Sequence, residues 1–400
     1  MTAPGLARPL DGVRIVDFST VLSGPIASGL LADQGADVIK IESPEGDTCR
    51  QIGPAKGDLS AMYITINRGK RSLAIDLKAP AARPVLAALL RWADVALNNF
   101  RPGVMERLGL TDDAMATTNP RLVRASITGY GPDGPAAGDK VYDAVIQAAA
   151  GVCASHRDHR TGEPTLLSTA VCDKLTALTA AQAITAALFA RERDGQGRRI
   201  EVSMLDAALA FQWPDAMYNH VFLDEPPAPF PEFGANNRPW KTADGFVTTM
   251  NPQQGEFIAL CRAIGRPDLP EDPRFTSLPS RGRYAKELRA LLEEPMSRMR
   301  TDELVAACRA TGAPIARINE RGEVIADPQV QHNQALVEID QGRVGRVRLP
   351  RSAARFDGQP MLPQAPAAHL GQHTREVLQA LGLPPAQIDR LIDDGVARQA

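Results

Sequence analysis

Short apolar runs alternate with longer amphipathic segments through the first half of the chain. The runs are rich in β-branched residues and occupy residues 13–18, 36–42, 72–77, 93–99 and 122–128. Such runs are typical of strands that are buried on both faces of a sheet, and helical patterns lie between several of them. This rhythm predicts an α/β fold with a doubly wound, mostly parallel, Rossmann-like sheet that carries helices on both faces.

The apolar pattern becomes helical over a longer distance in the middle of the chain. Residues 174–193 are rich in alanine and leucine and predict a long helix. The turn DGQG follows at 194–197, and a strand is predicted at 198–204. Four prolines within residues 224–234 then interrupt the pattern and are typical of a linker.

The pattern after the linker differs from the pattern before it. Residues 237–250 predict a hairpin with its turn at 243–245, and short amphipathic helices follow. Further on, a strand is predicted at 344–350 and a helix at 373–382. We therefore predict a large domain at 1–225, a small α+β domain at 226–330, and a C-terminal segment at 331–400 that returns to the large domain.

Composition and charge narrow the possible functions. The 400 residues carry a net charge of −2, which gives no general field to attract nucleic acid or an anionic membrane. No run approaches the ~18 apolar residues of a membrane span, and residues 1–10 lack the apolar core of a signal peptide. We therefore expect a cytoplasmic protein that binds neither nucleic acid nor membrane.

The spacing of the cysteines and glycines argues against disulfides, a metal site and a nicotinamide cofactor. The five cysteines are scattered without a CxxC pair, so we expect neither disulfides nor a metal site. Residues 129–134, GYGPDG, match the spacing of a dinucleotide-binding loop, but Pro132 and Pro135 remove N–H groups that a pyrophosphate would need. We interpret this stretch as a Gly/Pro-rich loop and expect no nicotinamide.

A cluster of three cations precedes one of the predicted strands. Residues 67–72, NRGKRS, offer Arg68, Lys70 and Arg71 as ligands for a phosphate group. Composition alone favours a solvated basic turn, so the residues by themselves leave both interpretations open.

Asp173 stands at the head of the long apolar stretch, in TAVCDKLTALTAAQ. Aspartate is a preferred N-cap, and the local sequence favours that interpretation. The same place also suits a nucleophile, because the helix dipole and the adjacent Lys174 would keep the carboxylate ionised, and aspartate forms covalent acyl intermediates. Cys172 is a rival nucleophile, but no histidine lies nearby in sequence to activate it.

Several segments, in this order, resemble the class III (CaiB/BaiF-type) CoA-transferases. The family includes formyl-CoA transferase and carnitine CoA-transferase, and the 2-methylacyl-CoA racemases are close relatives. The match is dense over residues 9–210 and continues weakly to about 382. The matching segments are PLDGVRIVDFSTVLSGP, GADVIKIESPEGD, NRGKRSLAIDLK, ADVALNNFRPGVMERLGL, NPRLVRASITGYGPDGP and ARERDGQGRRIEVSMLDAAL.

The resemblance implies an aspartate nucleophile, coenzyme A bound as an acyl-CoA substrate, and an interlocked homodimer. It assigns the nucleophile to Asp173, ahead of the turn at 195–198. Thr20 and Ser43 replace a histidine and an arginine of formyl-CoA transferase, which alters the substrate pocket and the adenine contact. The residues that the resemblance assigns to the CoA site are Val21, Ser23, Asn99, Phe100, Arg107, Lys140 and Met204, with Arg71 as a further candidate for the phosphates.

A comparison with the racemases distinguishes CoA transfer from racemisation. They place a histidine before an aspartate in a segment that matches residues 139–143, and Tyr142 stands in the histidine's position. A neutral phenol is a poor base for exchanging an α-proton, so we expect transfer of CoA, with Thr20, Tyr142 and Asp143 in the substrate pocket. Residues 232–238, EFGANNR, match a glycine-rich closing loop of formyl-CoA transferase but contain one glycine.

The expected reaction moves CoA from an acyl-CoA to a carboxylic acid through an aspartyl anhydride and an aspartyl-CoA thioester. A 2-methylacyl-CoA racemase or epimerase is the alternative enzyme. A CoA-binding protein without catalysis, in which Asp173 only caps its helix, is the alternative from another class. A nicotinamide oxidoreductase would rest on fold class alone, which does not determine function.

Overall fold

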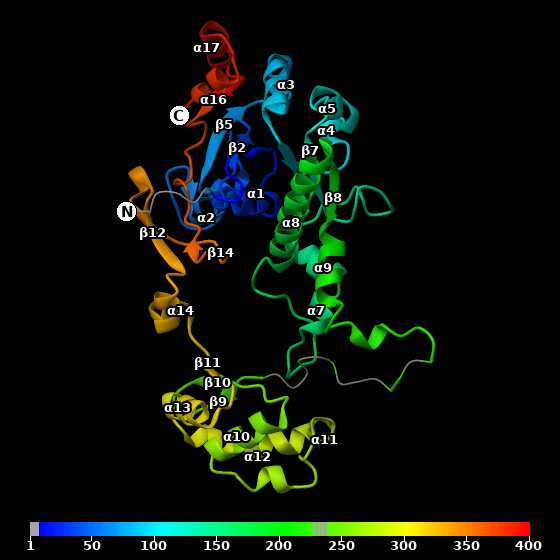
Figure 1. The fold of residues 1–400 in the computed structure, drawn as a ribbon, viewed down its shortest axis with the longest axis vertical. Helices are drawn as coiled ribbons and strands as arrows, with labels where there is room; N and C mark the ends of the chain where they lie inside the picture. Colours follow the sequence, from blue (N-terminus) through cyan, green and yellow to red (C-terminus); the bar gives the residue numbers. More distant parts are fainter. Residues whose placement is uncertain (1–7, 226, 229–231, 233, 235–237) are drawn as a thin grey trace. The chain divides into compact units, whose positions relative to one another are not determined.

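The computed structural model describes residues 8–225, 227–228, 232, 234 and 238–400. The chain forms two compact units (Figure 1). The first combines Met1–Pro214 with Gln334–Ala400, and the second is Asp215–Asn333. The chain therefore leaves the first unit once, builds the second, and returns.

A mostly parallel sheet forms the centre of the first unit. In the described residues it has seven strands in the order β16-β5-β2-β1-β6-β7-β8. Neighbouring strands are parallel except β16, which is antiparallel to β5. The predicted doubly wound sheet is confirmed, and the direction of winding reverses between β1 and β6. The strands are β1 (Arg14–Asp17), β2 (Asp37–Glu42), β5 (Lys70–Ile75), β6 (Val95–Asn98), β7 (Val123–Thr128), β8 (Arg199–Ser203) and β16 (Ala397–Arg398).

Helices cover both faces of this sheet. Successive strand residues point to opposite faces, so Ile15 joins the core on one side and Val16 the core on the other. The first face is covered by α1 (Ser23–Asp33), α6 (Asp143–Ala149), α7 (Val152–Ser155), α8 (Val171–Asp194) and α9 (Met204–Gln212). The second is covered by α3 (Arg83–Trp92), α4 (Val104–Arg107), α5 (Asp112–Thr118), α16 (Thr374–Ala380) and α17 (Pro385–Asp393).

A smaller cluster packs at the side of the first unit. Helix α2 (Ala61–Asn67) contributes Tyr63 to it, and the returning chain contributes Leu349. The predicted strand near residue 344 is confirmed as β13, which pairs antiparallel with β12. The short elements here are β3 (Ala55–Lys56), β4 (Leu59–Ser60), β12 (Leu336–Asp340), β13 (Arg346–Pro350), β14 (Arg355–Phe356) and β15 (Gln359–Pro360).

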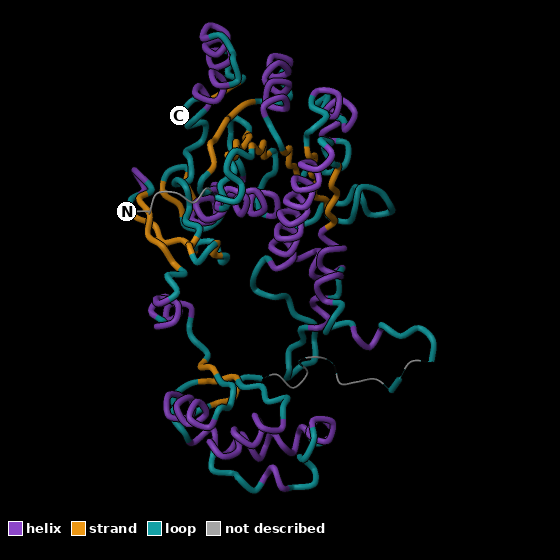
Figure 2. Tube along the Cα trace, viewed as in Figure 1, coloured by secondary structure: helices purple, strands orange, loops and turns teal. Residues whose placement is uncertain are grey.

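Helices are the main regular structure of the second unit (Figure 2). The predicted hairpin is confirmed: β9 (Trp240–Lys241) and β10 (Phe246–Thr248) are antiparallel, and β11 (Ala316–Arg317) joins β10. Phe257, Phe275 and Met296 lie in a core of their own, so this unit has its own apolar interior. Its helices are α10 (Gln254–Ala263), α11 (Leu278–Arg283), α12 (Ala285–Arg298), α13 (Thr301–Thr311), α14 (Arg321–Ala326) and α15 (Pro328–His332).

The sequence also led to predictions about two loops and about membrane-spanning helices. Residues 129–134 form no helix, and the next helix begins at Asp143, so the Gly/Pro-rich loop is confirmed. The prediction of a closing loop at 232–238 falls largely on residues outside the described ones. Among the helices that the structure describes, each is too short or too polar to span a bilayer.

Candidate active site

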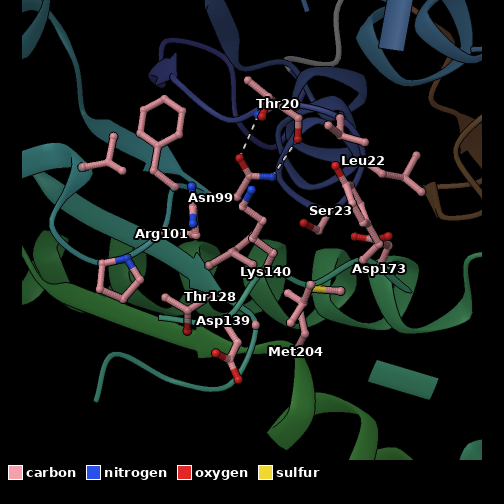
Figure 3. Close-up of a pocket in the computed structure, with 18 of the residues that line it drawn as sticks. Thr20, Leu22, Ser23, Asn99, Arg101, Thr128, Asp139, Lys140, Asp173 and Met204 are labelled. Carbon is pink, nitrogen blue, oxygen red and sulfur yellow. Dashed lines mark hydrogen bonds between the residues drawn. The ribbon is translucent and has the colours of Figure 1, made fainter. Parts of the chain in front are cut away.

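A cavity of about 500 Å³ opens at the carboxyl ends of β1 and β6. Strand order reverses between these two strands, and open α/β sheets bind ligands at such a switch point. The lining residues come from six places in the chain (Figure 3). They are the loop after β1 (20–23), the segment after β6 (99–104), the end of β7 (127–129), the loop at 137–142, Asp173 of α8 and Met204 of α9.

The structure brings together most of the residues that the sequence assigned to the site. Although they are distant in sequence, the ends of the strands and helices that carry them converge. Figure 3 shows Ser23 and Asp173 side by side at one end of the cavity, with Arg101 farther along. The predicted residues that line the cavity are Thr20, Val21, Ser23, Asn99, Phe100, Lys140, Tyr142, Asp173 and Met204.

Asp173 is not the cap of its helix. Helix α8 begins at Val171 with Ala170 as its N-cap, so Asp173 is the third helical residue, and the capping interpretation is wrong. Alanine has no side-chain acceptor, yet the backbone N–H of Asp173 donates to Asp143 Oδ1 at 2.9 Å. A carboxylate from another helix therefore satisfies an N–H group that a cap normally satisfies.

Asp173 binds a proton more readily than an ordinary aspartate does. Burial raises its pKa from 3.8 to about 6, and the nearby charge of Asp143 adds to the rise. Hydrogen bonds from the hydroxyl and the backbone N–H of Ser23 act in the opposite direction. The sequence led us to expect a stabilised anion next to Lys174, but the Lys174 ammonium donates to Thr169 Oγ1 at 2.6 Å instead.

Asp143, which the sequence placed in the substrate pocket, is not among the residues that line this cavity. It is 8% exposed and begins α6. Its Oδ2 accepts a hydrogen bond of 2.6 Å from Gln147 Nε2, which also donates to the carbonyls of Leu167 and Thr169. Asp143 thus connects α6 to the segment that leads into α8, and it acts on Asp173 through the backbone and through its charge.

Arg71 is also not at this cavity, because it lies near the amino end of β5 while the carboxyl ends of the strands form the site. It pairs with Asp37 at 2.7 Å and with Glu376 at 3.3 Å. The other cations of the NRGKRS segment are paired inside the fold, Arg68 with Asp33 and Lys70 with Asp17. The interpretation as a solvated basic turn is therefore wrong for most of this segment, since Arg68 and Lys70 are buried.

The cations at the cavity differ in part from those predicted. Arg107 is exposed at the end of α4 and does not line the cavity, although Val104 of the same helix does. Arg101 does line it, together with the predicted Lys140. The sequence reasoning missed Arg101 although it directly follows the predicted Phe100, and its place just after an apolar strand was the available signal.

The loop after β1 is held against the segment after β6. Asn99 Oδ1 accepts a hydrogen bond of 2.8 Å from the backbone N–H of Thr20, and Asn99 Nδ2 donates to the Thr20 carbonyl at 2.7 Å (Figure 3). Both polar groups of the Asn99 amide are therefore used within the protein. Gly24 allows this close packing, because a Cβ there would lie 2.2 Å from Ser19 Cβ.

Further cavities adjoin the first, and two of them concern the substrates. One of about 480 Å³ lies over the ends of β2 and β5, includes Ser43 and Lys78, and shares Phe100 with the first cavity. Another of about 660 Å³ lies between α1, α2 and the start of α8, and it reaches residues 170 and 174 on either side of Asp173. Its walls are mostly apolar, with Leu22, Ile26, Leu30, Met62 and Ile66 among them.

Comparison with known proteins shows what kind of protein carries this site. The model of CoA-transferase family III matches residues 10–374. The chain belongs to CoA-transferase family III. This family III member is 33% identical to a succinate–glutarate CoA-transferase of Agrobacterium fabrum, over 94% of its own length and 97% of the relative's. It is 34% identical to an acetyl-CoA:oxalate CoA-transferase of Acetobacter aceti, over 88% and 90% of the two chains.

Solved structures agree with this assignment. A Mycobacterium tuberculosis protein superposes with a TM-score of 0.83 at 32% identity, covering 93% of this family III chain and 99% of that one. A CaiB/BaiF family protein from Brucella suis superposes with a TM-score of 0.81 at 31% identity, covering 94% and 99%. The resemblance inferred from the sequence is confirmed, and with it the activity class of CoA-transferase with CoA thioesters as substrates.

Proposed function

We propose that this enzyme moves CoA from an acyl-CoA to a carboxylic acid, and that Asp173 is the nucleophile. The observation that carries the proposal is the position of this carboxylate, which lies at the end of a cavity at the switch point of a family III fold. Ser23 lies beside this carboxylate at the same cavity (Figure 3). A pKa of about 6 leaves it largely ionised at neutral pH yet more basic than an ordinary aspartate.

The proposed reaction has four steps that return Asp173 to its starting form. One carboxylate oxygen of Asp173 attacks the thioester carbonyl, the C–S bond breaks, and an acyl-aspartyl anhydride and CoA thiolate result. The thiolate attacks the aspartyl carbonyl and releases the donor acid. The acceptor carboxylate attacks the aspartyl-CoA thioester and forms a second anhydride, whose acyl group the thiolate then takes. The partial burial of Asp173 supports this scheme, because water would hydrolyse either anhydride.

We place CoA across the first two cavities. They share Phe100, whose ring offers a surface at their junction, and both open at the carboxyl ends of strands. Arg101 and Lys140 in the first cavity and Lys78 in the second are the cations for the phosphates. The pantetheine arm would then run through the first cavity toward Asp173, which brings the thioester to the nucleophile.

We place the acid portion of the substrates in the apolar cavity beside Asp173. Its methyl-rich walls suit a short hydrocarbon chain, and Lys174 at its margin forms no ion pair with any residue that the structure describes. A cation beyond an apolar wall fits a dicarboxylic acid, whose second carboxylate would reach Lys174. Relatives named for succinate and glutarate support this choice.

The test is to trap the covalent enzyme. The protein is incubated with an acyl-CoA, treated with hydroxylamine or borohydride, and digested, and the modified peptide is identified by mass spectrometry. We expect modification at Asp173, none in Asp173→Ala, and normal modification in the control Cys172→Ser, which removes the buried neighbouring thiol. Transfer activity retained by Asp173→Ala would refute the proposal. Exchange of an α-proton for deuterium without any acceptor acid would indicate a racemase instead.

We also propose that the enzyme acts as a homodimer. Helices α8 and α9 expose large apolar side chains, namely Leu178 (56%), Phe189 (62%) and Phe211 (60%). Rows of such residues on the surface of a unit mark an interface with another chain. Light scattering coupled to size-exclusion chromatography would give twice the 43.0 kDa chain mass. A monomer at micromolar concentration would contradict the proposal.

A further inference from the structure

The loop between β1 and α1 has a rare backbone conformation at Val21. Its φ is +65°, in the left-handed region that β-branched residues avoid because their side chains crowd the backbone. Such a conformation persists only where the surrounding structure holds it. Ser23 follows two residues later and lies beside Asp173 at the same cavity (Figure 3). The contacts that hold Val21 therefore also determine where Ser23 lies relative to Asp173.

Buried side chains bind the backbone of this loop one residue at a time, starting at Ser19. The Ser19 N–H donates to Asp17 Oδ1 at 2.9 Å, and the Ser19 carbonyl accepts from Lys40 Nζ at 2.8 Å. Asn99 then binds both backbone groups of Thr20. The backbone groups of Ser19 and Thr20, which precede Val21, are thus bound by residues of β1, β2 and the end of β6.

Asp47 binds the strained residue itself. Its Oδ1 and Oδ2 accept the Val21 N–H at 3.1 and 3.2 Å, and Oδ1 also accepts the Cys49 N–H at 2.9 Å. Lys40 Nζ lies 3.0 Å from Asp47 Oδ2, and the two side chains are 1% and 0% exposed. A buried carboxylate with a cation and backbone donors on both oxygens has a single well-defined position.

Lys40 contacts both the loop backbone and Asp47. Its ammonium binds the Ser19 carbonyl and the Asp47 carboxylate, so it fixes the loop on both sides of Thr20. Burial alone would lower its pKa, but the charges of Asp47 and Asp17 outweigh burial and raise it. The lysine is therefore held in its charged form beside Asp47.

We propose that Asp47, held by Lys40, is a positioning residue for the transfer reaction. It keeps Val21 left-handed and thereby holds Ser23 in place beside Asp173. The effect on the reaction rests on the function proposed above, whereas the effect on the loop does not. Asp47 lines the second cavity but not the cavity at Asp173, so its influence on that carboxylate passes through the backbone of the loop.

The first test compares Asp47→Ala with the double variant Val21→Gly/Asp47→Ala. A misplacement of about 1 Å lowers rates by about 10²-fold, so we expect kcat of Asp47→Ala to fall by about that factor. The Kd for CoA, measured by calorimetry on the same variants, separates the two effects, because Asp47 also lines the second cavity and a change in binding there would appear in Kd and not in kcat. Glycine adopts positive φ without strain, so the double variant should regain about tenfold of the lost kcat.

The second test looks at the loop without measuring activity. Crystal structures of Asp47→Ala should show Val21 with negative φ and Ser23 away from Asp173. If the alanine variant fails to fold, Asp47→Asn serves instead, since its amide oxygen still accepts from Val21 while the charge opposite Lys40 is lost, and a smaller fall in kcat is expected. A left-handed Val21 with Ser23 in place would overturn the proposal, as would equal kcat loss in the single and double variants.

A matched control separates positioning from loss of stability. Asp94 also accepts a backbone N–H, from Arg14 at 2.9 Å, and also pairs with a cation, Arg191 at 2.9 Å. It lies at the amino end of β6, away from the cavity. Asp94→Ala should lower the Tm without changing kcat, and an equal fall in kcat would overturn the proposal. If the wild-type enzyme transfers no CoA, the proposed function fails, and the crystallographic comparison still decides the positioning of the loop.

Discussion

Two groups of carboxylates lie near the same edge of the sheet, one with cations beside it and one without. Asp17 and Glu42 are buried, and burial alone would raise the pKa of each. Lys70 and Lys40 lower the pKa of Asp17 below its usual value, and hydrogen bonds from Arg50 together with the charge of Lys40 do the same for Glu42. These carboxylates therefore remain charged, and they serve the fold.

Asp143 and Asp173 form the second group. Among the residues that the structure describes, neither makes an ion pair with a cation. Burial and the neighbouring carboxylate raise the pKa of Asp173 to about 6. The comparison teaches that burial by itself does not set the charge of an aspartate, because nearby cations decide the sign of the shift. A carboxylate left without one, beside a cavity, is a candidate for chemistry.

The largest expected effect comes from removing the unpaired carboxylate. Asp173→Asn keeps the size of the side chain but removes the nucleophile, and we expect the transfer rate to fall by about 10³-fold or more. Steady-state assays by mass detection of new thioesters would measure it. Cys172→Ser is the control and should retain the wild-type rate. A loss of less than tenfold in Asp173→Asn would mean that the reaction does not pass through this residue.

Breaking a paired carboxylate should instead affect stability. Glu42 binds Arg50 through two hydrogen bonds of 2.7 Å, and both side chains are buried. Glu42→Ala leaves the guanidinium buried with one partner fewer, which should lower the free energy of unfolding by about 3–5 kcal/mol.

Urea unfolding at neutral pH would measure this loss. The matched control is Asp37→Ala, which breaks the half-exposed pair with Arg71; such surface pairs contribute about 1 kcal/mol or less. Equal losses in the two variants would show that burial of the pair has no special importance.

Removal of the unpaired carboxylate should make the protein more stable at high pH. The pKa of Asp173 is 3.8 in the reference state and about 6 when folded, so the folded state binds the proton more tightly. The stability that this group contributes is complete below pH 3.8 and is lost as pH rises through about 6.

Asp173→Asn has no carboxylate to ionise, so it does not lose stability as pH rises. Its free energy of unfolding at pH 8 should exceed that of the wild type by ~1–3 kcal/mol. The advantage over the wild type should shrink at pH 5. Paired urea titrations at the two pH values would test this sign, and a wild type that is the more stable protein at pH 8 would contradict it.

The smallest expected effect concerns the neighbour of the nucleophile. Asp143→Asn removes the charge that adds to the raised pKa of Asp173, so the pH at half-maximal transfer rate should move from about 6 toward 3.8. Burial is the larger cause and remains, so the shift should be less than the full ~2 units between these values. Single-turnover rates between pH 4 and about 8 would measure it. An upward shift would show that Asp143 does not act through its charge.

Much of the architecture follows from local patterns. Each predicted strand of the first half is present, because an apolar run buried on both faces has few alternatives to a parallel strand. The hairpin after the linker and the loop at 129–134 were also predictable, since their glycine and proline residues restrict the backbone. The family resemblance, carried by the order of many segments, was sufficient to assign the activity class.

The positions that the sequence did not anticipate depend on partners far away in the chain. Arg71 was read as a ligand for phosphate, but its carboxylate partners Asp37 and Glu376 lie on another strand and near the C-terminus. Arg101 was passed over although its place just after an apolar strand was a signal, because only the folded chain shows that it lines the cavity. Asp143 was placed in the pocket, whereas it binds the backbone N–H of Asp173 from behind.

For this protein, the sequence alone determined the order of strands and helices and the identity of one carboxylate at the start of the long helix. These depend on residue spacing, which is a local property. Only the tertiary structure decided which carboxylates are charged and which cations are free for a ligand. Those properties depend on burial and on charges within a few ångströms, and the residues concerned, such as Asp143 beside Asp173 or Lys40 beside Asp47, meet only when the chain has folded.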